Sequence, residues 1–356
     1  MESFIDGKIR ELQNILSSKK SVVILMHDNP DPDAIASAWA LHHLLKRRFG
    51  VNSIISYGGI IARAENKAMV KHLNIPLVPW NKIEISKHSD IALVDTQPGV
   101  GNNSLPSKIT PLMVIDHHPI SSKIKLKFRP AFYDIRDNVG ATTSILYEYL
   151  SSCEFPIPKL LATAMFYGIS SETRNLGREA VDLDQTAYIE LFPHTSKRIL
   201  ANITHPKNTR EYFAVLAHGL NTAMANDTTA FCHLGEVNHP DYIHQIADLM
   251  LTCENIRWSL CTGWWGPVLY LSLRATNNRA KAGVMVRKLV GSHGKAGGHD
   301  TMAGGKLEYT CQVTDTMRQT VESLISKRFA RYCGRTRLRD YRSMTLLDKP
   351  LSSAND

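Results

Sequence analysis

The sequence has no apolar run long enough to span a bilayer, and none of its six cysteines belongs to a CxxC pair. A chain of 356 residues can bury a sizeable core without disulfide staples, so we expect reduced thiols and a cytoplasmic location. The N-terminal segment, MESFIDGKIRELQNIL, lacks the basic start and the continuous apolar stretch of a signal peptide. Its apolar spacing is that of an amphipathic helix. Together these absences indicate a protein that does not act in a membrane.

The sequence also contains no internal repeat and no low-complexity tract. Hydrophobic residues make up 43% and charged residues 21%, which is typical of globular proteins, and the length is typical of two domains. A polar segment that contains proline, NITHPKNTR, is typical of a linker. We therefore predict a first domain over residues 1–200, a linker over 201–210, a second domain over 211–330 and a basic C-terminal tail over 331–356.

Positive charge is concentrated near the C-terminus. The net charge is +9, and the segment Lys327–Arg342 contains seven basic residues and one acidic residue, a balance of +6. Excess positive charge favours anionic partners such as nucleic acid or phosphates. The segment is either a contact for such a partner or a solvated surface, and the sequence leaves both interpretations open.

Short, β-branched apolar segments alternate with helical stretches in the first 200 residues. Such segments are typical of strands buried on both faces, and their alternation with helices predicts an α/β domain with a doubly wound parallel sheet. Strands are expected at 21–26, 51–57, 90–96 and 111–118, and helices at 34–49, 63–73, 138–151, 157–170 and 182–202.

After the linker the pattern restarts and predicts a smaller α/β domain. The glycine-rich segment 291–305, GSHGKAGGHDTMAGG, is expected to be a loop. Strands are expected near 228–237, 255–261 and 267–274, and helices near 208–224, 241–252 and 278–291.

Acidic and imidazole side chains follow three of the predicted strands of the first domain. In an open parallel sheet, ligands bind beyond the carboxyl ends of the strands, so these groups are expected to meet at that edge. A further acid lies in the segment FYGISSET. The residues concerned are His27, Asp31 and Asp33 after the first strand, Asp95 after the third, Asp116, His117 and His118 after the fourth, and Glu172.

Carboxylates gathered at one edge repel one another, and divalent cations relieve that repulsion. Imidazole nitrogens and carboxylate oxygens without cysteine favour manganese, magnesium or iron over zinc. About six ligands exceed what one ion needs, whereas two ions bridged by one carboxylate fit the number and suit displacement at phosphorus. A simpler interpretation of the DPD sequence remains, in which Asp33 caps the helix that begins at Ala34.

Four segments, HDNPDPDAIAS, VDTQPG, IDHHP and GISSET, resemble the signature motifs of the DHH phosphoesterase superfamily. The segments SLRAT and AGGHDTMAGG resemble its DHH-associated C-terminal domain, so the resemblance covers roughly residues 21–305. It implies an active site in the cleft between a DHH domain and a smaller substrate-binding domain. It also implies two manganese ions, with Mg²⁺ or Fe²⁺ as alternatives, held by His27, Asp31, Asp33, Asp95, His117 and Glu172.

The resemblance further implies roles for individual residues. Asp95 falls at the bridging position, His118 at the position that points at the substrate phosphate, and Asp116 at one that orients an imidazole. Two positions depart from the family pattern, because Glu172 stands where aspartate is usual and Ala296 where the first glycine of the C-terminal loop is usual. In the second domain, the resemblance implies that the phosphate or nucleotide is bound by Arg274, Gly297, Gly298 and His299.

Within the superfamily, the compact two-domain architecture is similar to that of nanoRNases. About 50 residues follow position 305, too few for the additional domain of RecJ-type exonucleases, and the segments of membrane-bound cyclic dinucleotide phosphodiesterases are absent. The segment SLRATNNRAK lacks the Arg-Lys-Lys cluster of the family's pyrophosphatases. The expected activity is manganese-dependent hydrolysis of very short oligonucleotides or linear dinucleotides to mononucleotides, with 3′-phosphoadenosine 5′-phosphate as a further candidate substrate.

Two other functions stay open. One is a phosphomonoesterase or exopolyphosphatase-like hydrolase of small phosphorylated metabolites, and the other is a catalytically inactive nucleic-acid-binding protein. An inactive protein would be expected to have lost a carboxylate or the second histidine of the DHH motif, whereas this chain shows only the change to Glu172. The expected partners are short RNA or a nucleotide, without a membrane, and a homodimer is left open.

Overall fold

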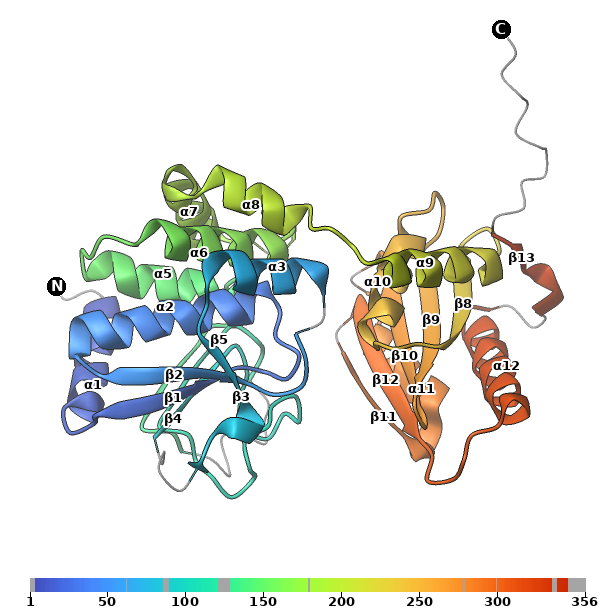
Figure 1. Cartoon of the computed structure of the whole chain (residues 1–356), viewed down its shortest axis with the longest axis horizontal. Helices are drawn as coiled ribbons and strands as arrows, with labels where there is room; N and C mark the ends of the chain where they lie inside the picture. Colours follow the sequence, from blue (N-terminus) through green and yellow to red (C-terminus); the bar gives the residue numbers. More distant parts are fainter. Residues whose placement is uncertain are drawn as a thin grey trace, which may run out of the picture. The chain divides into compact units, whose positions relative to one another are not determined.

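The computed structural model describes residues 4–61, 63–85, 90–120, 129–178, 180–277, 279–298, 300–334 and 338–344. The chain divides into two compact units, Met1–Lys207 and Asn208–Asp356, and the division falls inside the predicted linker. Figure 1 shows the helices and strands of each unit. Among the described residues, no helix is both long and apolar enough to cross a membrane.

The first unit contains a parallel sheet of six strands in the order β3-β2-β1-β4-β5-β6. This arrangement confirms the predicted α/β fold. The two halves of the sheet extend in opposite directions from the neighbours β1 and β4, so the topological switch point lies between these two strands. The strands are β1 (Ser21–Leu25), β2 (Asn52–Tyr57), β3 (Leu77–Pro79), β4 (Ile91–Val94), β5 (Met113–Asp116) and β6 (Phe132–Ile135).

The described α-helices of the unit pack in one core cluster on one face of this sheet, and Figure 1 shows α2, α5 and α6 on one side of β1, β2 and β4. The single helix predicted over 182–202 is wrong, because Pro193, which has no backbone N–H, falls between two shorter helices. The helix predicted from Asn138 begins four residues later, after Ala141 in an extended conformation. The helices are α1 (Phe4–Leu16), α2 (Pro32–Phe49), α3 (Ala64–Leu73), α5 (Thr142–Ser152), α6 (Lys159–Glu172), α7 (Asp182–Leu191) and α8 (Lys197–Thr204), with short 3₁₀ turns η1 (Trp80–Lys82) and η3 (Phe192–His194).

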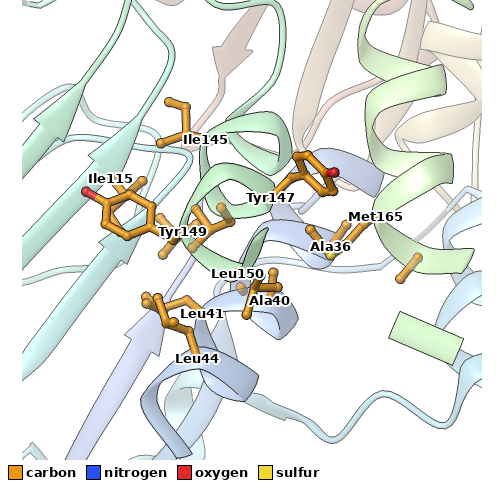
Figure 2. Close-up of a cluster of buried hydrophobic side chains, with 14 of the residues drawn as sticks. Ala36, Ala40, Leu41, Leu44, Ile115, Ile145, Tyr147, Tyr149, Leu150 and Met165 are labelled. Carbon is orange, nitrogen blue, oxygen red and sulfur yellow. The ribbon is translucent and has the colours of Figure 1, made fainter. Parts of the chain in front are cut away.

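The main core of the unit lies between the sheet and α2, α5 and α6 (Figure 2). Small residues of α2, Ala36 and Ala40, let α6 approach closely, while Leu41 and Leu44 fill the space beside them. Each fully buried leucine contributes about 1.5–3 kcal/mol by leaving water. Alternate residues of β1 belong to two different core clusters, one on each side of the sheet, so the strand is buried on both faces as predicted.

Gly168 of α6 lies where this helix crosses α2. A Cβ atom there would lie 2.9 Å from Ala36 Cβ, 3.0 Å from Thr143 Oγ1 and 3.1 Å from the Pro32 carbonyl oxygen. We expect Gly168→Val to lower the free energy of unfolding by about 2–3 kcal/mol, because the larger side chain forces these elements apart. Urea unfolding followed by circular dichroism measures the change.

Gly7 provides the matched control, because it lies inside α1 and no atom would lie within 4 Å of an added Cβ. Gly7→Ala is expected to raise the free energy of unfolding by about 0.5–1 kcal/mol through helix propensity alone. If Gly168→Val and Gly7→Ala changed stability equally, the close approach of α2 and α6 would be refuted.

The second unit contains a mixed sheet of seven strands in the order β11-β12-β10-β9-β8-β7-β13. Strands β8 and β9 are parallel, and the other neighbours are antiparallel. These strands form the second, smaller α/β domain that the sequence predicts. They are β7 (Met224–Ala225), β8 (Thr229–Glu236), β9 (Trp258–Trp265), β10 (Val268–Ala275), β11 (Gly294–Gly298), β12 (Met302–Glu308) and β13 (Arg342–Ser343).

The prediction of a loop over the glycine-rich segment 291–305 is wrong, because most of this segment forms the hairpin of β11 and β12. The glycines serve close packing, because a Cβ at Gly294 would lie 2.5 Å from Val290 Cβ and one at Gly305 would lie 2.7 Å from Val286 Cγ1. Both valines belong to the helix that covers the hairpin. The glycines in these strands therefore mark the close approach of the hairpin to the helix, and the high glycine content by itself did not reveal the strands.

The helices of the second unit cover both faces of its sheet. Phe231 and Cys232, adjacent on β8, belong to two different core clusters, and Phe231 packs with the helices nearest the C-terminus. The helices are α9 (Arg210–Thr222), α10 (Asp241–Leu251), α11 (Ala282–Val290) and α12 (Asp315–Tyr332), with the 3₁₀ turns η4 (Gly291–His293) and η5 (Leu338–Asp340).

Part of the predicted basic tail belongs to this fold. Tyr341 is buried, its ring centroid lies 5.1 Å from that of Phe231, and its hydroxyl forms a 2.7 Å hydrogen bond with the Thr229 hydroxyl. Strand β13 pairs with β7 at the edge of the sheet. The prediction of a tail is therefore wrong for residues 338–344, because the many basic residues around Tyr341 concealed one apolar anchor.

His233 of β8 makes the second unit sensitive to acid. Its Nδ1 and Nε2 atoms each lie 2.6 Å from a hydroxyl oxygen, those of Thr262 and Ser326, and burial lowers the pKa of the ring to about 4. The unfolded chain takes up a proton near the ordinary pKa of about 6.5 and the folded chain does not, so stability falls as the pH drops from there to about 4.

We expect the free energy of unfolding to be lower at pH 5 than at pH 7 by about 2 kcal/mol because of His233. Urea unfolding of wild type and His233→Asn at both pH values measures this difference. The asparagine variant, which does not titrate, should lose that part of the pH dependence. An identical pH dependence in both proteins would contradict the neutral state of His233 in the folded protein.

Candidate metal centre

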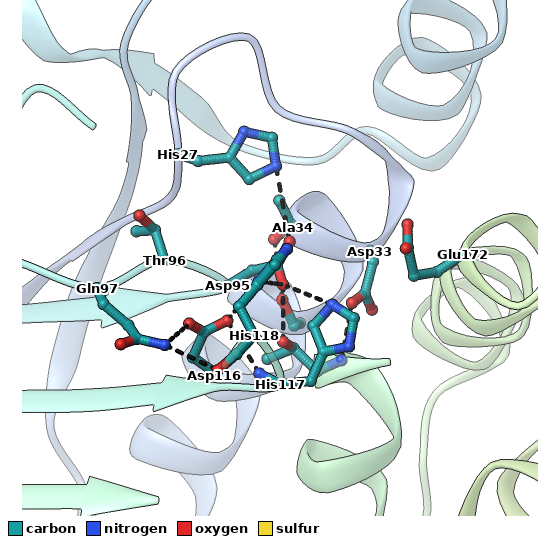
Figure 3. A network of polar contacts seen from close by, with 12 residues as sticks. His27, Asp33, Ala34, Asp95, Thr96, Gln97, Asp116, His117, His118 and Glu172 are labelled. Atoms are coloured by element: carbon teal, nitrogen blue, oxygen red, sulfur yellow. Dashed lines mark hydrogen bonds and ion pairs between the residues drawn. The ribbon is translucent and has the colours of Figure 1, made fainter. Parts of the chain in front are cut away.

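The carboxyl ends of β1, β4 and β5 carry the predicted site residues (Figure 3). His27 follows β1, Asp95 follows β4, and Asp116 is the last residue of β5. Leu25 of β1 is level with Leu93 of β4, and Val94 of β4 is level with Ile115 of β5. Side chains that leave these strand ends therefore meet at one edge of the sheet, at its switch point.

Asp95 lies at the middle of this group and is buried. Its Oδ2 atom lies 3.6 Å from His27 Nε2, and its Oδ1 atom lies 3.6 Å from His117 Nε2. Asp31 Oδ2 also lies 3.6 Å from His27 Nε2. The two oxygens of one carboxylate thus face two different imidazoles, which is the arrangement of a bridging ligand.

Two groups of three side chains that could hold a cation share Asp95. One consists of His27, Asp31 and Asp95, and the other of Asp95, His117 and His118, each with one ligand atom per residue within 4.8 Å of the others. Ligand atoms bound about 2.1 Å from one ion lie roughly 3–4 Å apart, so the 3.6 Å separations fit. The donor set and its spacing are those of a divalent metal centre.

Hydrogen bonds to the backbone orient two of the imidazoles. His27 Nδ1 lies 3.0 Å from the carbonyl oxygen of Asp28, and His117 Nδ1 lies 3.2 Å from that of Val139. In the neutral rings Nδ1–H donates to these carbonyls, which leaves the Nε2 lone pairs directed at Asp95. Burial by itself lowers the pKa of His27, but the carboxylates of Asp31 and Asp95 raise it to about 10, so a proton and a cation compete for this nitrogen.

Asp33 is fully buried and binds the start of another helix. Its carboxylate accepts hydrogen bonds from the backbone N–H groups of Thr142, at 2.7 Å, and Thr143, at 2.9 Å, at the N-terminus of α5. The interpretation of Asp33 as the cap of the helix at Ala34 is wrong, because Asp31 accepts the 3.0 Å hydrogen bond from Ala34 N instead. Burial, followed by the charge of Asp95, raises the pKa of Asp33.

Glu172 is the last residue of α6, and its Oε1 accepts a 2.6 Å hydrogen bond from Arg178 Nη2. Burial and the charge of Asp31 raise the pKa of its carboxyl group. Figure 3 shows Glu172 and Asp33 beside the central group. Four of the six predicted ligands thus lie in the two groups of three, and these two carboxylates border them.

His118 is held by Asp116 at a different angle from the other imidazoles. Its Nδ1 lies 2.8 Å from Asp116 Oδ1, while Asp116 Oδ2 accepts a 2.6 Å hydrogen bond from Gln97 Nε2. Burial opposes protonation of His118, but the hydrogen bond to Asp116 and the charge of Asp95 raise its pKa to about 10. The hydrogen bond to Asp116 fixes the ring with its second nitrogen directed away from Asp116.

Sequence analysis did not assign three residues that position this group. Gln97 fixes Asp116, and Arg178 pairs with Glu172. The Thr142 hydroxyl donates a 2.7 Å hydrogen bond to Asp95 Oδ1. Gln97 lies inside the VDTQPG segment, two residues after Asp95, and this closeness in sequence was the signal that could have identified it. Thr142 is distant in sequence from Asp95, and Arg178 lies beyond the end of the helix that carries Glu172.

Comparison with known proteins identifies the family. The model of the DHH family, N-terminal domain, matches residues 21–169, the segment that carries all of these strand ends. An uncharacterized protein of Methanocaldococcus jannaschii is 34% identical over 339 residues, which are 93% of this chain and 68% of that protein. The chain belongs to the DHH superfamily of phosphoesterases.

More distant similarities cover part of the chain or its fold. A probable manganese-dependent inorganic pyrophosphatase of Streptococcus equi subsp. zooepidemicus is 24% identical over 189 residues, 48% of this chain and 57% of that protein. The chain therefore spans just over half of that relative's length. The crystal structure of an exopolyphosphatase-related protein from Bacteroides fragilis has the same fold, with a TM-score of 0.69 and 14% identity over 90% of this chain and 96% of that chain.

In the second unit of this DHH protein, Arg274 lies on β10 and the glycines predicted to bind substrate lie on β11, with β12 between the two strands. Arg274 pairs with Met302 across β10 and β12, and Gly298 pairs with Ala303 across β11 and β12. Gly298 must be glycine, because it has φ 138° and a Cβ there would lie 2.4 Å from the Met302 carbonyl oxygen. Gly297 precedes it on β11, whereas His299 lies outside the described residues.

Arg274 is almost completely buried, which sequence analysis did not anticipate. Its Nε donates a 2.5 Å hydrogen bond to Asp248 Oδ1 on α10, and Nη1 donates to the carbonyl oxygen of Leu273. A guanidinium held in this way keeps a fixed position for its remaining N–H groups. The substrate-binding role of Arg274 stays a prediction.

Proposed function

We propose that this protein hydrolyses phosphoester bonds with two divalent cations, most suitably Mn²⁺, at the group centred on Asp95. The observation that carries the proposal is that the two oxygens of Asp95 face His27 and His117 separately. The six proposed ligands are His27, Asp31, Asp33, Asp95, His117 and Glu172, and Mg²⁺ or Fe²⁺ are the alternative ions.

The neighbouring side chains support hydrolysis at phosphorus. Bound divalent cations would lower the pKa of a water molecule and neutralise charge on the phosphate group. His118, oriented by Asp116, would donate a hydrogen bond to a phosphate oxygen as negative charge develops there. Thr142 keeps Asp95 in its bridging orientation, and Gln97 keeps Asp116 turned toward His118.

The proposed substrates are linear dinucleotides and very short RNA oligonucleotides, with 3′-phosphoadenosine 5′-phosphate as a further candidate. Arg274 and the backbone of Gly297 and Gly298 are proposed to hold a second phosphate or the nucleotide end. The absence of an Arg-Lys-Lys cluster from the segment SLRATNNRAK favours these substrates over pyrophosphate.

A second candidate function is hydrolysis of pyrophosphate or polyphosphate. It is favoured by the similarity of 48% of this chain to a probable inorganic pyrophosphatase. The same metal centre would serve both reactions, so the substrate alone separates the two candidates.

A panel of substrates with Mn²⁺ tests both candidates. It contains linear dinucleotides, RNA five-mers, cyclic dinucleotides, 3′-phosphoadenosine 5′-phosphate, pyrophosphate and polyphosphate, each with wild type and His118→Gln. We expect kcat/KM for linear dinucleotides to exceed the values for pyrophosphate and cyclic dinucleotides at least tenfold. Fastest turnover of pyrophosphate or polyphosphate would favour the second candidate, and no turnover of any compound by the Mn²⁺-loaded protein would favour a binding protein.

A further inference from the structure

The second unit has a basic pocket far along the chain from the metal centre. Its volume is about 490 Å³, within the range of sites that bind small molecules. Helices α11 and α12, which pack against each other, form it near their C-terminal ends. The lining residues are Lys288, Leu289, Gly291, Arg328, Arg331 and Tyr332.

The charge around this pocket has one sign. Residues 279–298 contain five basic residues and no acidic residue, and residues 323–334 contain three basic residues and no acidic residue. Among the residues that the structure describes, Lys288, Arg328 and Arg331 form no ion pair with a carboxylate. Three cations in one concave surface favour a ligand with more than one negative charge.

The pocket also offers an aromatic surface. Tyr332 is 39% exposed, and the Lys288 ammonium lies 5.1 Å from the centroid of its ring. Arg328 Nη1 donates a 2.7 Å hydrogen bond to the Leu289 carbonyl oxygen, which anchors this side chain at the end of α11. A partly exposed aromatic ring among cations is the combination that binds the base and the phosphate of a nucleotide in a single strand.

We propose that this pocket binds a nucleotide unit of single-stranded nucleic acid. The base stacks on Tyr332, and the flanking phosphates contact Lys288, Arg328 and Arg331. A double helix keeps its bases stacked on one another, so the aromatic surface favours a single strand. The proposal goes beyond the hydrolysis reaction and does not depend on it, because none of these residues belongs to the metal centre.

Binding of a fluorescein-labelled single-stranded RNA of 12 nucleotides to the full-length protein tests the proposal. Fluorescence anisotropy is measured in EDTA, where the RNA is not cleaved, over a series of KCl concentrations. Lys288→Gln combined with Arg331→Gln is expected to weaken binding at least tenfold at low salt. The slope of log K against log salt should fall by about 1.4, which is about 0.7 for each cation removed.

Two further pairs of variants separate nucleotide recognition from general attraction. Tyr332→Leu should weaken binding about tenfold at every salt concentration, whereas Tyr332→Phe, which keeps the ring, should bind like wild type. Arg210→Gln removes one exposed cation at the start of α9, which packs on the other face of the sheet, and should weaken binding less than twofold.

Several results would overturn the proposal. The double variant could bind RNA like Arg210→Gln, or Tyr332→Leu could bind like Tyr332→Phe. Polyphosphate of equal charge could compete as well as RNA, which would show that the pocket binds polyanions by charge and does not recognise a base. Adenosine monophosphate could compete as well as RNA per nucleotide, which would make its ligand a free nucleotide. All of these are binding measurements, so failure of the hydrolysis proposal would leave them intact.

Discussion

Asp95→Asn is expected to abolish hydrolysis and to remove at least one of two bound metal ions. An amide has one neutral oxygen in place of two charged ones, so it cannot bridge two cations. We expect kcat/KM for the best substrate to fall by at least about 10³-fold, the loss of several kcal/mol of transition-state stabilisation. Titration calorimetry with Mn²⁺ should give a stoichiometry of two for wild type and one or less for the variant.

The structure makes asparagine the correct replacement at this position. Asp95 has φ 58°, in the left-handed region that asparagine tolerates better than alanine. Its side-chain oxygen can still accept the hydrogen bond from the Thr142 hydroxyl. The thermal midpoint should therefore stay close to that of wild type, so that loss of metal and activity is not loss of fold.

Asp137→Asn is the matched control, because it neutralises an exposed carboxylate a few residues before α5. It should bind two ions and retain activity within about twofold, as expected for a surface change. The bridged pair would be refuted if Asp95→Asn still bound two Mn²⁺ ions and kept its rate.

His118→Gln is expected to lower kcat by about 10²–10³-fold and to leave the stoichiometry of Mn²⁺ binding at two. The Nδ1 atom of His118 is already hydrogen-bonded to Asp116, so the ring is positioned as a donor to substrate. Glutamine occupies similar space but has a neutral side chain. Steady-state kinetics together with calorimetry separates the loss of a donor from the loss of a ligand.

His118 also forms a group of three possible ligands with Asp95 and His117, and its Nδ1 lies 3.7 Å from Asp95 Oδ1. A drop in stoichiometry from two to one in His118→Gln would assign it as a metal ligand and contradict its role as a donor. His72→Gln, an exposed histidine of α3, should change neither quantity and serves as the control.

The central strands of the first unit could be predicted from sequence because their signal is local. The segments around β1, β4 and β5 are apolar on both faces, and each ends in polar residues. Strands β3 and β6 lie at the sheet edges and lack a continuous buried run: no residue of β3 is buried, and β6 alternates buried and more exposed residues over only four positions. The strands that sequence analysis missed are therefore the edge strands, which are not apolar on both faces.

The candidate site could be predicted in composition but not in geometry. His27, Asp95 and His117 could be predicted to lie close together, because each follows a strand and the carboxyl ends of parallel strands lie at one edge of the sheet. The different roles of Asp31 and Asp33 could not be predicted, because the second contact of Asp33 comes from α5, more than 100 residues later. Long-range hydrogen bonds of this kind leave no trace in a local pattern.

The pairing of β13 with β7 has a consequence for the order in which the protein is made. Domains fold one after another during synthesis, from the N-terminus, so the first unit can form while the ribosome is still translating the second. Strand β7, however, keeps an open edge until residues 342 and 343 have been made. Open strand edges pair readily with other chains, so a nascent polypeptide halted after α12 would be prone to aggregate and a natural client for chaperones.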